Sequence, residues 1–188
     1  MKALRYGNLA REITIRRPRK IIEVGTCKGE RAEMMIRAAL VYGPVEYIGF
    51  DLFDTPPEGE FSARTQPWTV AEVKARLEPL GADVRLIQGD TRKTLPACGI
   101  TGADFVFLDG GHSDETVASD FAAVLRCIVP GTPIMCDDYW NYPGGGGCNK
   151  LVDGLDREKF AVTLLEPVDE FRKPYGILRT QIVKVLPL

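Results

Sequence analysis

The sequence lacks the features that mark membrane proteins and nucleic-acid-binding proteins. No run of about 18 apolar residues occurs, and no apolar segment near the start indicates a secretory signal, so we expect neither a membrane span nor secretion. The formal net charge is −2 at pH 7, which provides no positively charged surface for a phosphate backbone. Basic residues gather at 16–20, but a nucleic acid needs many more charges, so this cluster is interpreted as solvated surface. We therefore expect neither nucleic acid nor a membrane as a partner.

Cysteine is present, but without a paired spacing. The five cysteines are scattered and their number is odd, which is typical of free thiols in a reducing compartment. With the missing signal segment, this predicts a cytoplasmic protein. At 188 residues, 45% hydrophobic and 27% charged, the chain has the length and composition of one soluble domain. We expect that domain to span 1–188, with a leading helix in 1–19 and the core in 20–188.

Short apolar runs alternate with helical patterns along most of the chain. A buried parallel strand reads as such a run, and a strand followed by a glycine loop and a helix opens a Rossmann-like unit. Two β-rich segments, 160–165 and 177–185, follow and predict a terminal antiparallel pair. The pattern predicts an α/β fold with a Rossmann-like, seven-stranded, mostly parallel sheet and helices on both faces. Its parallel strands are expected at 20–24, 45–50, 84–88, 103–108 and 132–136.

The first expected strand runs into a glycine loop of the form E-x-G-x-x-x-G, from Glu23 to Gly29. It differs from the dinucleotide fingerprint G-x-G-x-x-G, because a single glycine, Gly25, occupies the tight turn. By itself the loop could be a plain strand-to-helix turn. Acids at the next strand ends favour a ligand. Asp51 follows the second strand, where carboxylates accept hydrogen bonds from ribose hydroxyls, and Asp90 follows the third, beside the position of an adenine.

Three carboxylates stand at the ends of the fourth and fifth expected strands. Asp109 follows one apolar run, and Asp137 with Asp138 follows the other. Neighbouring strands lie about 5 Å apart, and like charges so close raise one another's pKa unless a cation lies between them. The arrangement therefore invites a divalent cation. Asp109 could instead lie beside a cofactor without any metal, and the residues leave both alternatives open.

From about Lys20 to Val185, these motifs resemble those of the class I S-adenosylmethionine-dependent methyltransferases. In that family the glycine loop accommodates the methionine part of the cofactor, the acid after the second strand holds the ribose, and the region after the third strand contacts the adenine. The resemblance therefore implies S-adenosylmethionine as the cofactor. Its expected binding residues are Glu23, Gly25, Thr26, Gly29, Asp51, Leu52, Gly89, Asp90 and Asp109.

The motifs DGGHS at 109–113 and DDY at 137–139 are similar to those of a subgroup of small bacterial methyltransferases. They also have the spacing of the metal-dependent catechol-type O-methyltransferases, which carry D-x-x-K and D-N at these places and bind magnesium through the aspartates and the asparagine. This resemblance implies Mg²⁺ held by Asp109, Asp137 and Asp138. It puts His112 where those enzymes carry a lysine implicated as the base. Gly111 stands where sugar-modifying relatives have a further acid, which argues against an identical mechanism.

His112, the single histidine of the chain, and Asp109 are therefore the expected catalytic residues. Histidine accepts a proton near neutral pH, which suits removing one from a hydroxyl, and a cation on that hydroxyl would lower its pKa further. A structural role for His112, bonded to the start of its helix or to the cofactor's edge, stays open. Loop aromatics predict a pocket for a flat or apolar acceptor, and they are Phe53, Phe61, Trp68, Tyr139, Trp140 and Tyr142.

The sequence thus predicts a metal-assisted O-methyltransferase that acts on a small hydroxylated molecule, with lids at 52–67 and 142–148. Three alternatives remain: a metal-independent methyltransferase acting on another atom, a module that binds the cofactor without turnover, and a nucleotide-sugar or nicotinamide enzyme of the same architecture. Few residues precede the first strand to cover an acceptor. We therefore hypothesise that a second copy of the chain, in a homodimer, supplies the cover.

Overall fold

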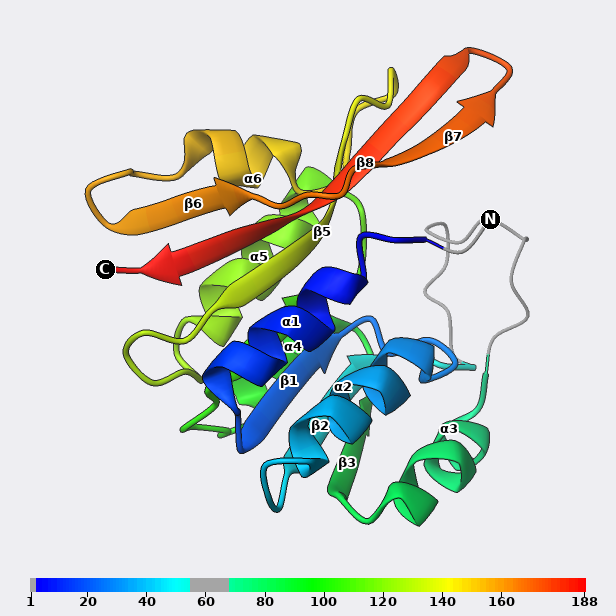
Figure 1. The fold of residues 1–188 in the computed structure, drawn as a ribbon, viewed down its shortest axis with the longest axis vertical. Helices are drawn as coiled ribbons and strands as arrows, with labels where there is room; N and C mark the ends of the chain where they lie inside the picture. The colour runs from blue at the N-terminus through cyan, green and yellow to red at the C-terminus, as the bar shows by residue number, and fades with distance from the viewer. Residues whose placement is uncertain (1–2, 55–67) are drawn as a thin grey trace.

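The computed structural model describes residues 3–54 and 68–188, and within these a central sheet lies between two layers of helices (Figure 1). The helices are α1 (Gly7–Arg16), α2 (Glu30–Leu40), α3 (Val70–Leu77), η1 (Glu78–Leu80), α4 (Thr91–Ala97), α5 (Asp114–Val124) and α6 (Asn149–Gly154). The strands are β1 (Lys20–Val24), β2 (Glu46–Asp51), β3 (Asp83–Gln88), β4 (Phe105–Leu108), β5 (Ile134–Trp140), β6 (Phe160–Leu164), β7 (Asp169–Lys173) and β8 (Gly176–Pro187). Over the described ranges, no helix combines the length and hydrophobicity that crossing a membrane requires.

The strand order is β3-β2-β1-β4-β5-β8-β6, with β7 paired to β8. Strands β1 to β5 pair in parallel, whereas β8 runs antiparallel to β5, β6 and β7. This confirms the predicted Rossmann-like, mostly parallel sheet with antiparallel strands at the C-terminus. Strand β1 has β2 on one side and β4 on the other. The chain therefore builds the sheet outward in one direction from β1 to β3 and in the other direction from β4 to β5. Open α/β sheets bind their ligands beside the carboxyl ends of the strands at such a reversal.

The described sheet has eight strands, one more than the sequence predicts. The additional strand, β7, lies in the polar segment between the two predicted terminal strands. It carries a single large apolar residue, Phe171, so it shows no alternation of apolar and polar side chains. Pairing stabilises it instead, because the first half of the long strand β8 forms a hairpin with it. Figure 1 shows this hairpin extending away from the body of the sheet.

The parallel strands β1, β2, β4 and β5 are largely buried on both faces, as their apolar runs predict, whereas the edge strand β3 is partly exposed. All residues of β4 are buried, and Ile21, Ile22 and Val24 of β1 have no exposed surface. On one face, α1 inserts Leu9 and Ile13 into the cluster formed by α2 and α3, and burying each such side chain stabilises the fold by about 1.5–3 kcal/mol. The other face is covered by α4, α5 and α6. The leading helix is therefore part of the core, and it fixes the segment that precedes it.

Strand register brings the ends of the central strands level. Val24 of β1 pairs with Leu108 of β4, and Leu108 pairs with Cys136 of β5. The residues that come next, Asp109 and Asp137, therefore emerge side by side at one edge of the sheet. This is the edge at which the sequence predicts the site.

Candidate active site

Asp109 emerges at the end of β4, where the glycine loop packs against it. Its N–H donates to the carbonyl oxygen of Val24 at 2.8 Å. A Cβ on Gly25 would overlap the carbonyl oxygen of Asp109, and Gly25 has φ +91°, so this turn requires glycine. Burial, followed by the charges of Asp137 and Asp138, raises the pKa of the Asp109 carboxyl well above its usual range. A positive charge beside Asp109 would relieve this repulsion.

Asp137 forms a bidentate ion pair with Arg5, which lies in the segment before α1. The guanidinium donates from Nε to Oδ1 at 2.7 Å and from Nη2 to Oδ2 at 2.9 Å. Its Nη1 also donates to Asp169, at the start of β7, at 3.1 Å. Burial lowers the pKa of Arg5, but the hydrogen bond and charge of Asp137 outweigh it, so the pKa is raised overall. Asp137 is 3% exposed and Arg5 7%, so each charge depends on the other for compensation.

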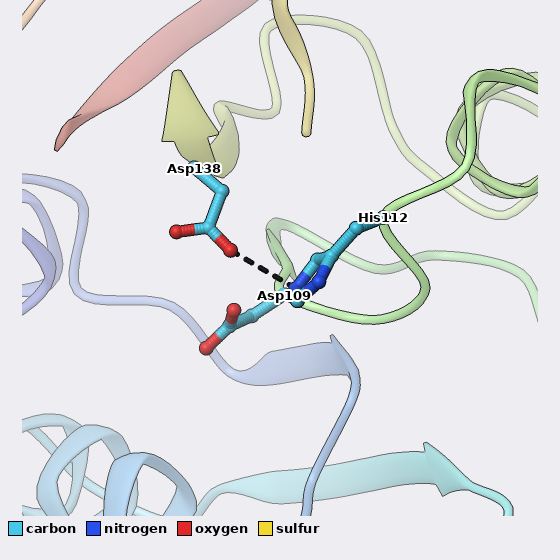
Figure 2. A group of neighbouring side chains, drawn as sticks. All are labelled: Asp109, His112 and Asp138. Carbon is cyan, nitrogen blue, oxygen red and sulfur yellow. Dashed lines mark ion pairs between the residues drawn. The ribbon is translucent and has the colours of Figure 1, made fainter. Parts of the chain in front are cut away.

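Asp138 contacts His112 through one oxygen, while its other oxygen, Oδ1, lies 3.6 Å from Nη2 of Arg5. Strand β5 bulges against β8 between Cys136 and Tyr139, and Asp138 takes a left-handed conformation with φ +58°. Its carboxylate approaches the imidazole in Figure 2, with 3.0 Å between Oδ2 and Nε2. Thr180 donates to Oδ1 at 3.4 Å. The hydrogen bond to Asp138 raises the pKa of His112, although burial opposes the rise.

Asp109, His112 and Asp138 form a group that could hold a metal ion. Each offers one ligand atom, and these atoms lie within 4.8 Å of one another (Figure 2). The resemblance implied Asp109, Asp137 and Asp138 as ligands. The structure brings two of these together with His112, whereas both oxygens of Asp137 accept from Arg5. With 56% of its side chain exposed, His112 keeps the group open to solvent.

A hollow of about 330 Å³, part of it open to solvent, lies beside this group. His112 and Asp138 contribute to its lining, as do Gly147 and Cys148 of the glycine-rich segment. The N–H of Gly147 donates to the carbonyl oxygen of His112 at 2.9 Å, and that of Cys148 donates to the carbonyl oxygen of Asp138 at 3.2 Å. The segment predicted as a lid is thus hydrogen-bonded to the backbone of both residues.

Two of the expected acceptor aromatics, Trp140 and Tyr142, lie in line with His112. The ring centroids of His112 and Trp140 are 5.3 Å apart, those of Trp140 and Tyr142 are 5.7 Å apart, and Tyr175 continues the row at 5.5 Å from Tyr142. This row runs from the imidazole to the turn of the β7–β8 hairpin. The other expected aromatics are Phe53 in the hydrophobic core, Tyr139 bonded to Asp153 of α6, Trp68 just before α3, and Phe61 outside the described residues.

Apart from Asp109, the residues expected at the cofactor lie at or just beyond the carboxyl ends of β1, β2 and β3. Glu23 has no exposed surface; the Tyr47 hydroxyl donates to its Oε2, while its Oε1 has no hydrogen-bond partner among the described residues. Burial raises the pKa of Glu23 to about 8, although the hydrogen bond from Tyr47 opposes the rise. Asp51 accepts from the N–H groups of Cys27 and Phe53, at 2.7 and 2.8 Å. This edge therefore contains a buried acid with an unused acceptor.

Asp90 caps helix α4 at the end of the same edge. It accepts from the N–H of Arg92 at 3.0 Å and pairs with its guanidinium at 2.7 Å. Gly89 precedes it with φ +133°. The remaining expected residues are Gly29 at the N-cap of α2, Thr26 with its hydroxyl 3.3 Å from that of Tyr47, and Leu52 directly after β2. The expected cofactor residues thus lie along the ends of neighbouring strands.

Arg5, Tyr6 and Asp169 are at the site without having been expected there. Nη2 of Arg5 donates to the Tyr6 hydroxyl at 2.7 Å. Burial, followed by the charges of Asp109 and Asp137, raises the pKa of Tyr6. No motif surrounds these residues in the sequence. The one sequence feature that points to such a residue is the group of three neighbouring carboxylates. Carboxylates this close are stabilised in their charged form by a cation, which another part of the chain can supply.

Comparisons with known proteins agree with this arrangement. The model of a family described as a methyltransferase domain matches residues 22–139. A search of curated proteins gave no match. The O-methyltransferase TomG from Streptomyces achromogenes, solved in complex with SAM, is 18% identical with a TM-score of 0.66, and the alignment covers 100% of this chain and 81% of that one. The O-methyltransferase from Bacillus cereus, in complex with SAH, is 16% identical with a TM-score of 0.61, covering 99% and 82%.

A putative rRNA-methylase from Clostridium thermocellum is 16% identical with a TM-score of 0.68, covering 100% of both chains. At such identities, the likeness to these structures shows a shared fold. The family match spans more than half of the chain and includes the glycine loop, Asp109, His112 and Asp138. The chain therefore belongs to this family of methyltransferase domains, which confirms the resemblance to class I S-adenosylmethionine-dependent methyltransferases.

Proposed function

We propose that the protein transfers the methyl group of S-adenosylmethionine to a hydroxyl of a small molecule. The observation that carries this proposal is the bond between Nε2 of His112 and Asp138, beside Asp109 and at the strand edge that bears the glycine loop. The O-methyltransferases among the similar structures, one with SAM and one with SAH, support this choice of cofactor and reacting atom.

The charges of the site suit this cofactor. When bound, S-adenosylmethionine supplies a methyl group on a positively charged sulfur. A cation beside Asp109 would relieve the repulsion that, with burial, raises the pKa of this acid, and Oε1 of Glu23 has no hydrogen-bond partner among the described residues. Each Asp51 oxygen accepts one backbone N–H and can accept a second donor, such as a ribose hydroxyl. A dinucleotide fits less well, because its pyrophosphate would be repelled by the same acids.

His112 is proposed as the base, and its bond to Asp138 decides which nitrogen acts. An ionised carboxylate only accepts hydrogen bonds, so Nε2 carries the proton of this bond and Nδ1 has the free lone pair. Nδ1 then accepts the proton of the acceptor hydroxyl. Asp138 holds the imidazole in place and stabilises the imidazolium that forms, as the acid of a catalytic triad does.

A divalent cation such as Mg²⁺ is proposed on Asp109 and Asp138, whose oxygens are the ligand type that this ion prefers. A cation there would lower the pKa of a coordinated hydroxyl. Asp137 suits this role less than the resemblance implied, because both of its oxygens accept from Arg5. The guanidinium of Arg5 also favours a second candidate, metal-independent transfer, since it already pairs with Asp137 at 2.7 Å and lies 3.6 Å from Asp138.

Calorimetry with S-adenosylmethionine, S-adenosylhomocysteine and NAD tests the cofactor, and a panel of phenols, alcohols and amines with methyl-labelled cofactor tests the acceptor. We expect both sulfur compounds to bind, a phenol or alcohol to be methylated, and His112→Ala to slow transfer while leaving cofactor affinity nearly unchanged. Binding of NAD in place of the sulfur compounds would overturn the proposal. Cofactor binding with transfer to no member of the panel would favour a binding module.

A further inference from the structure

The proposed cofactor has three charged groups at its methionine end: a sulfonium, an ammonium and a carboxylate. The acids at the strand edge complement the two positive groups. The carboxylate needs a cation or a set of N–H donors, because desolvating it without a partner is costly. Resting on the function proposed above, the question is which cation of this chain is left to receive it.

Arg31 is the candidate that the described residues leave available. It lies in the first turn of α2, just past the glycine loop, and is half-buried. In the described part of the chain, its guanidinium forms neither an ion pair nor a hydrogen bond, and its one direct contact of note is with the ring of Tyr6. By contrast, Arg5 is engaged by Asp137 and Asp169, and Lys28 pairs with Glu30 at 3.0 Å.

The position of Arg31 is unfavourable for a cation on its own. The N-terminal end of a helix carries partial positive charge, which favours anions and disfavours a guanidinium. The guanidinium carbon lies 3.7 Å from the centroid of the Tyr6 ring, and such a contact fixes the plane of the group. A cation held rigidly at a helix start, without a protein anion, is arranged to receive a negatively charged ligand.

Two neighbours place this guanidinium at the cofactor edge. Tyr6, the ring that Arg31 covers, accepts from Nη2 of Arg5 at 2.7 Å, and the same nitrogen donates to Asp137 at 2.9 Å. Burial raises the pKa of Glu23, whose Oε1 has no partner among the described residues, and the nearby guanidinium of Arg31 opposes part of that rise. Glu23 and Arg31 are nevertheless not bonded to each other. The free oxygen of Glu23 and the guanidinium of Arg31 match the ammonium and the carboxylate of an amino-acid zwitterion.

We propose that Arg31, held flat against Tyr6, binds the carboxylate of the cofactor's methionine moiety, with Glu23 on the side of the ammonium. Because the N-terminal segment supplies both Tyr6 and Arg5, it joins the cofactor half of the site to the acceptor half. In the sequence, Arg31 has the position of an ordinary polar residue on an amphipathic helix. The sequence therefore does not predict it among the cofactor residues.

Calorimetry with two ligands tests the assignment without any turnover: S-adenosylmethionine, and decarboxylated S-adenosylmethionine, which lacks only the carboxylate. For the unaltered protein, we expect the complete cofactor to bind about 10- to 100-fold more tightly, the range of a charge-assisted bidentate contact. Arg31→Met should remove that preference by weakening the complete cofactor while leaving the decarboxylated one nearly unchanged. Arg31→Lys should retain part of it, because the charge stays but the fork is lost.

The matched control is Arg37→Met, which makes the same change on the same helix at a side chain that is 63% exposed and paired with Glu33. It should leave both affinities unchanged. Equal weakening of both ligands by Arg31→Met, or an undiminished preference, would overturn the assignment. If Arg31→Met fails to fold, Arg31→Gln is measured in the same comparison with the same two outcomes. An unaltered protein that binds neither ligand would instead overturn the proposed function.

Discussion

Arg5 and Asp137, 132 residues apart in the sequence, are joined by two parallel hydrogen bonds of 2.7 and 2.9 Å in the interior of the site. This pair changes the electrostatics of the strand edge, because the three carboxylates that look uncompensated in the sequence have a resident cation. The two consecutive acids nevertheless have different partners. Both oxygens of Asp137 accept from the guanidinium, whereas Asp138, at the bulge in β5, contacts His112 at 3.0 Å and the guanidinium only at 3.6 Å.

Arg5→Met should destabilise the protein by about 3–5 kcal/mol, because it leaves the buried charge of Asp137 without a partner. Urea denaturation followed by circular dichroism measures the change in the free energy of unfolding. The double variant Arg5→Met/Asp137→Asn should recover part of the loss, since the orphaned charge is then absent. Arg37→Met, at an exposed ion pair, should cost no more than about 0.5 kcal/mol. A loss as small for Arg5→Met as for this control would contradict the buried pair.

Chelation should abolish methyl transfer, and Mg²⁺ or Mn²⁺ should restore it, if a cation on Asp109 and Asp138 assists the reaction. Mn²⁺ binding, followed by electron paramagnetic resonance, locates the ligands independently of activity. Asp138→Asn should weaken Mn²⁺ binding more than Asp137→Asn, because both oxygens of Asp137 already accept hydrogen bonds from Arg5. Full activity in excess chelator would remove both acids from this role and favour the metal-independent candidate.

His112 should titrate at a higher pH than an ordinary histidine, because Asp138 stabilises the imidazolium and so raises its pKa. Because the chain has a single histidine, its two carbon-bound ring protons can be assigned without ambiguity in a proton NMR titration with chelator present. Asp138→Asn should lower this pKa, and asparagine tolerates the left-handed backbone found there.

The sign of the pH dependence follows from that shift. The folded-state pKa is raised, so the pair contributes stability below the unfolded-state pKa, and this contribution is lost as pH rises through the folded-state pKa. Transfer should run the opposite way and rise through the same pKa, because the base acts when neutral. Asp138→Asn should move this rise to lower pH. An unshifted titration in the variant would show that Asp138 does not set the pKa of His112.

Gly25→Ala should be far more damaging than Gly81→Ala. Both glycines have positive φ, which costs about 1–2 kcal/mol for alanine. Nothing lies within 4 Å of the added methyl at Gly81, whereas at Gly25 it would overlap the carbonyl oxygen of Asp109. Thermal denaturation and cofactor calorimetry should therefore show a modest loss of stability for Gly81→Ala and a displaced site for Gly25→Ala. Equal effects would mean that the glycine loop does not pack against Asp109 in this way.

Asp120→Asn should stabilise the protein at neutral pH. Asp120 in α5 is 3% exposed, its Oδ1 has no partner among the described residues, and burial raises its pKa to about 6. For an acid with a raised pKa, ionisation opposes folding, so stability falls as pH rises from the unfolded-state pKa toward 6 and stays reduced above it. The gain should reach about 2–3 kcal/mol at pH 7.5 and vanish near pH 4. A gain that is the same at both pH values would point to packing instead of charge.

The parts of the fold that the sequence predicts are those encoded by local pattern. Parallel strands such as β1 and β4 are continuous apolar runs because both faces are buried, and the local pattern T-x-x-E from Thr69 to Glu72 forms a capping box at the start of α3. β7 was missed because its charged residues are held by pairing with β8, a long-range interaction that leaves no periodic signature.

The same distinction applies to the site. Asp109, Asp138 and His112 could be singled out because each follows a recognisable strand end, and the structure brings them together. Arg5 could not, because a cation recruited from another part of the chain depends on how α1 docks on the sheet. The different partners of Asp137 and Asp138 depend on the bulge in β5. Such a local distortion of the backbone cannot be predicted from a simple sequence pattern.

The segment shared with the methyltransferase family, residues 22–139, contains neither Arg5 nor Asp169. A protein trimmed to those limits would keep the glycine loop, Asp109 and Asp137, yet it would leave the buried carboxylate of Asp137 without its guanidinium partner. The ion-pair network at this strand edge therefore extends beyond the region by which the family is recognised.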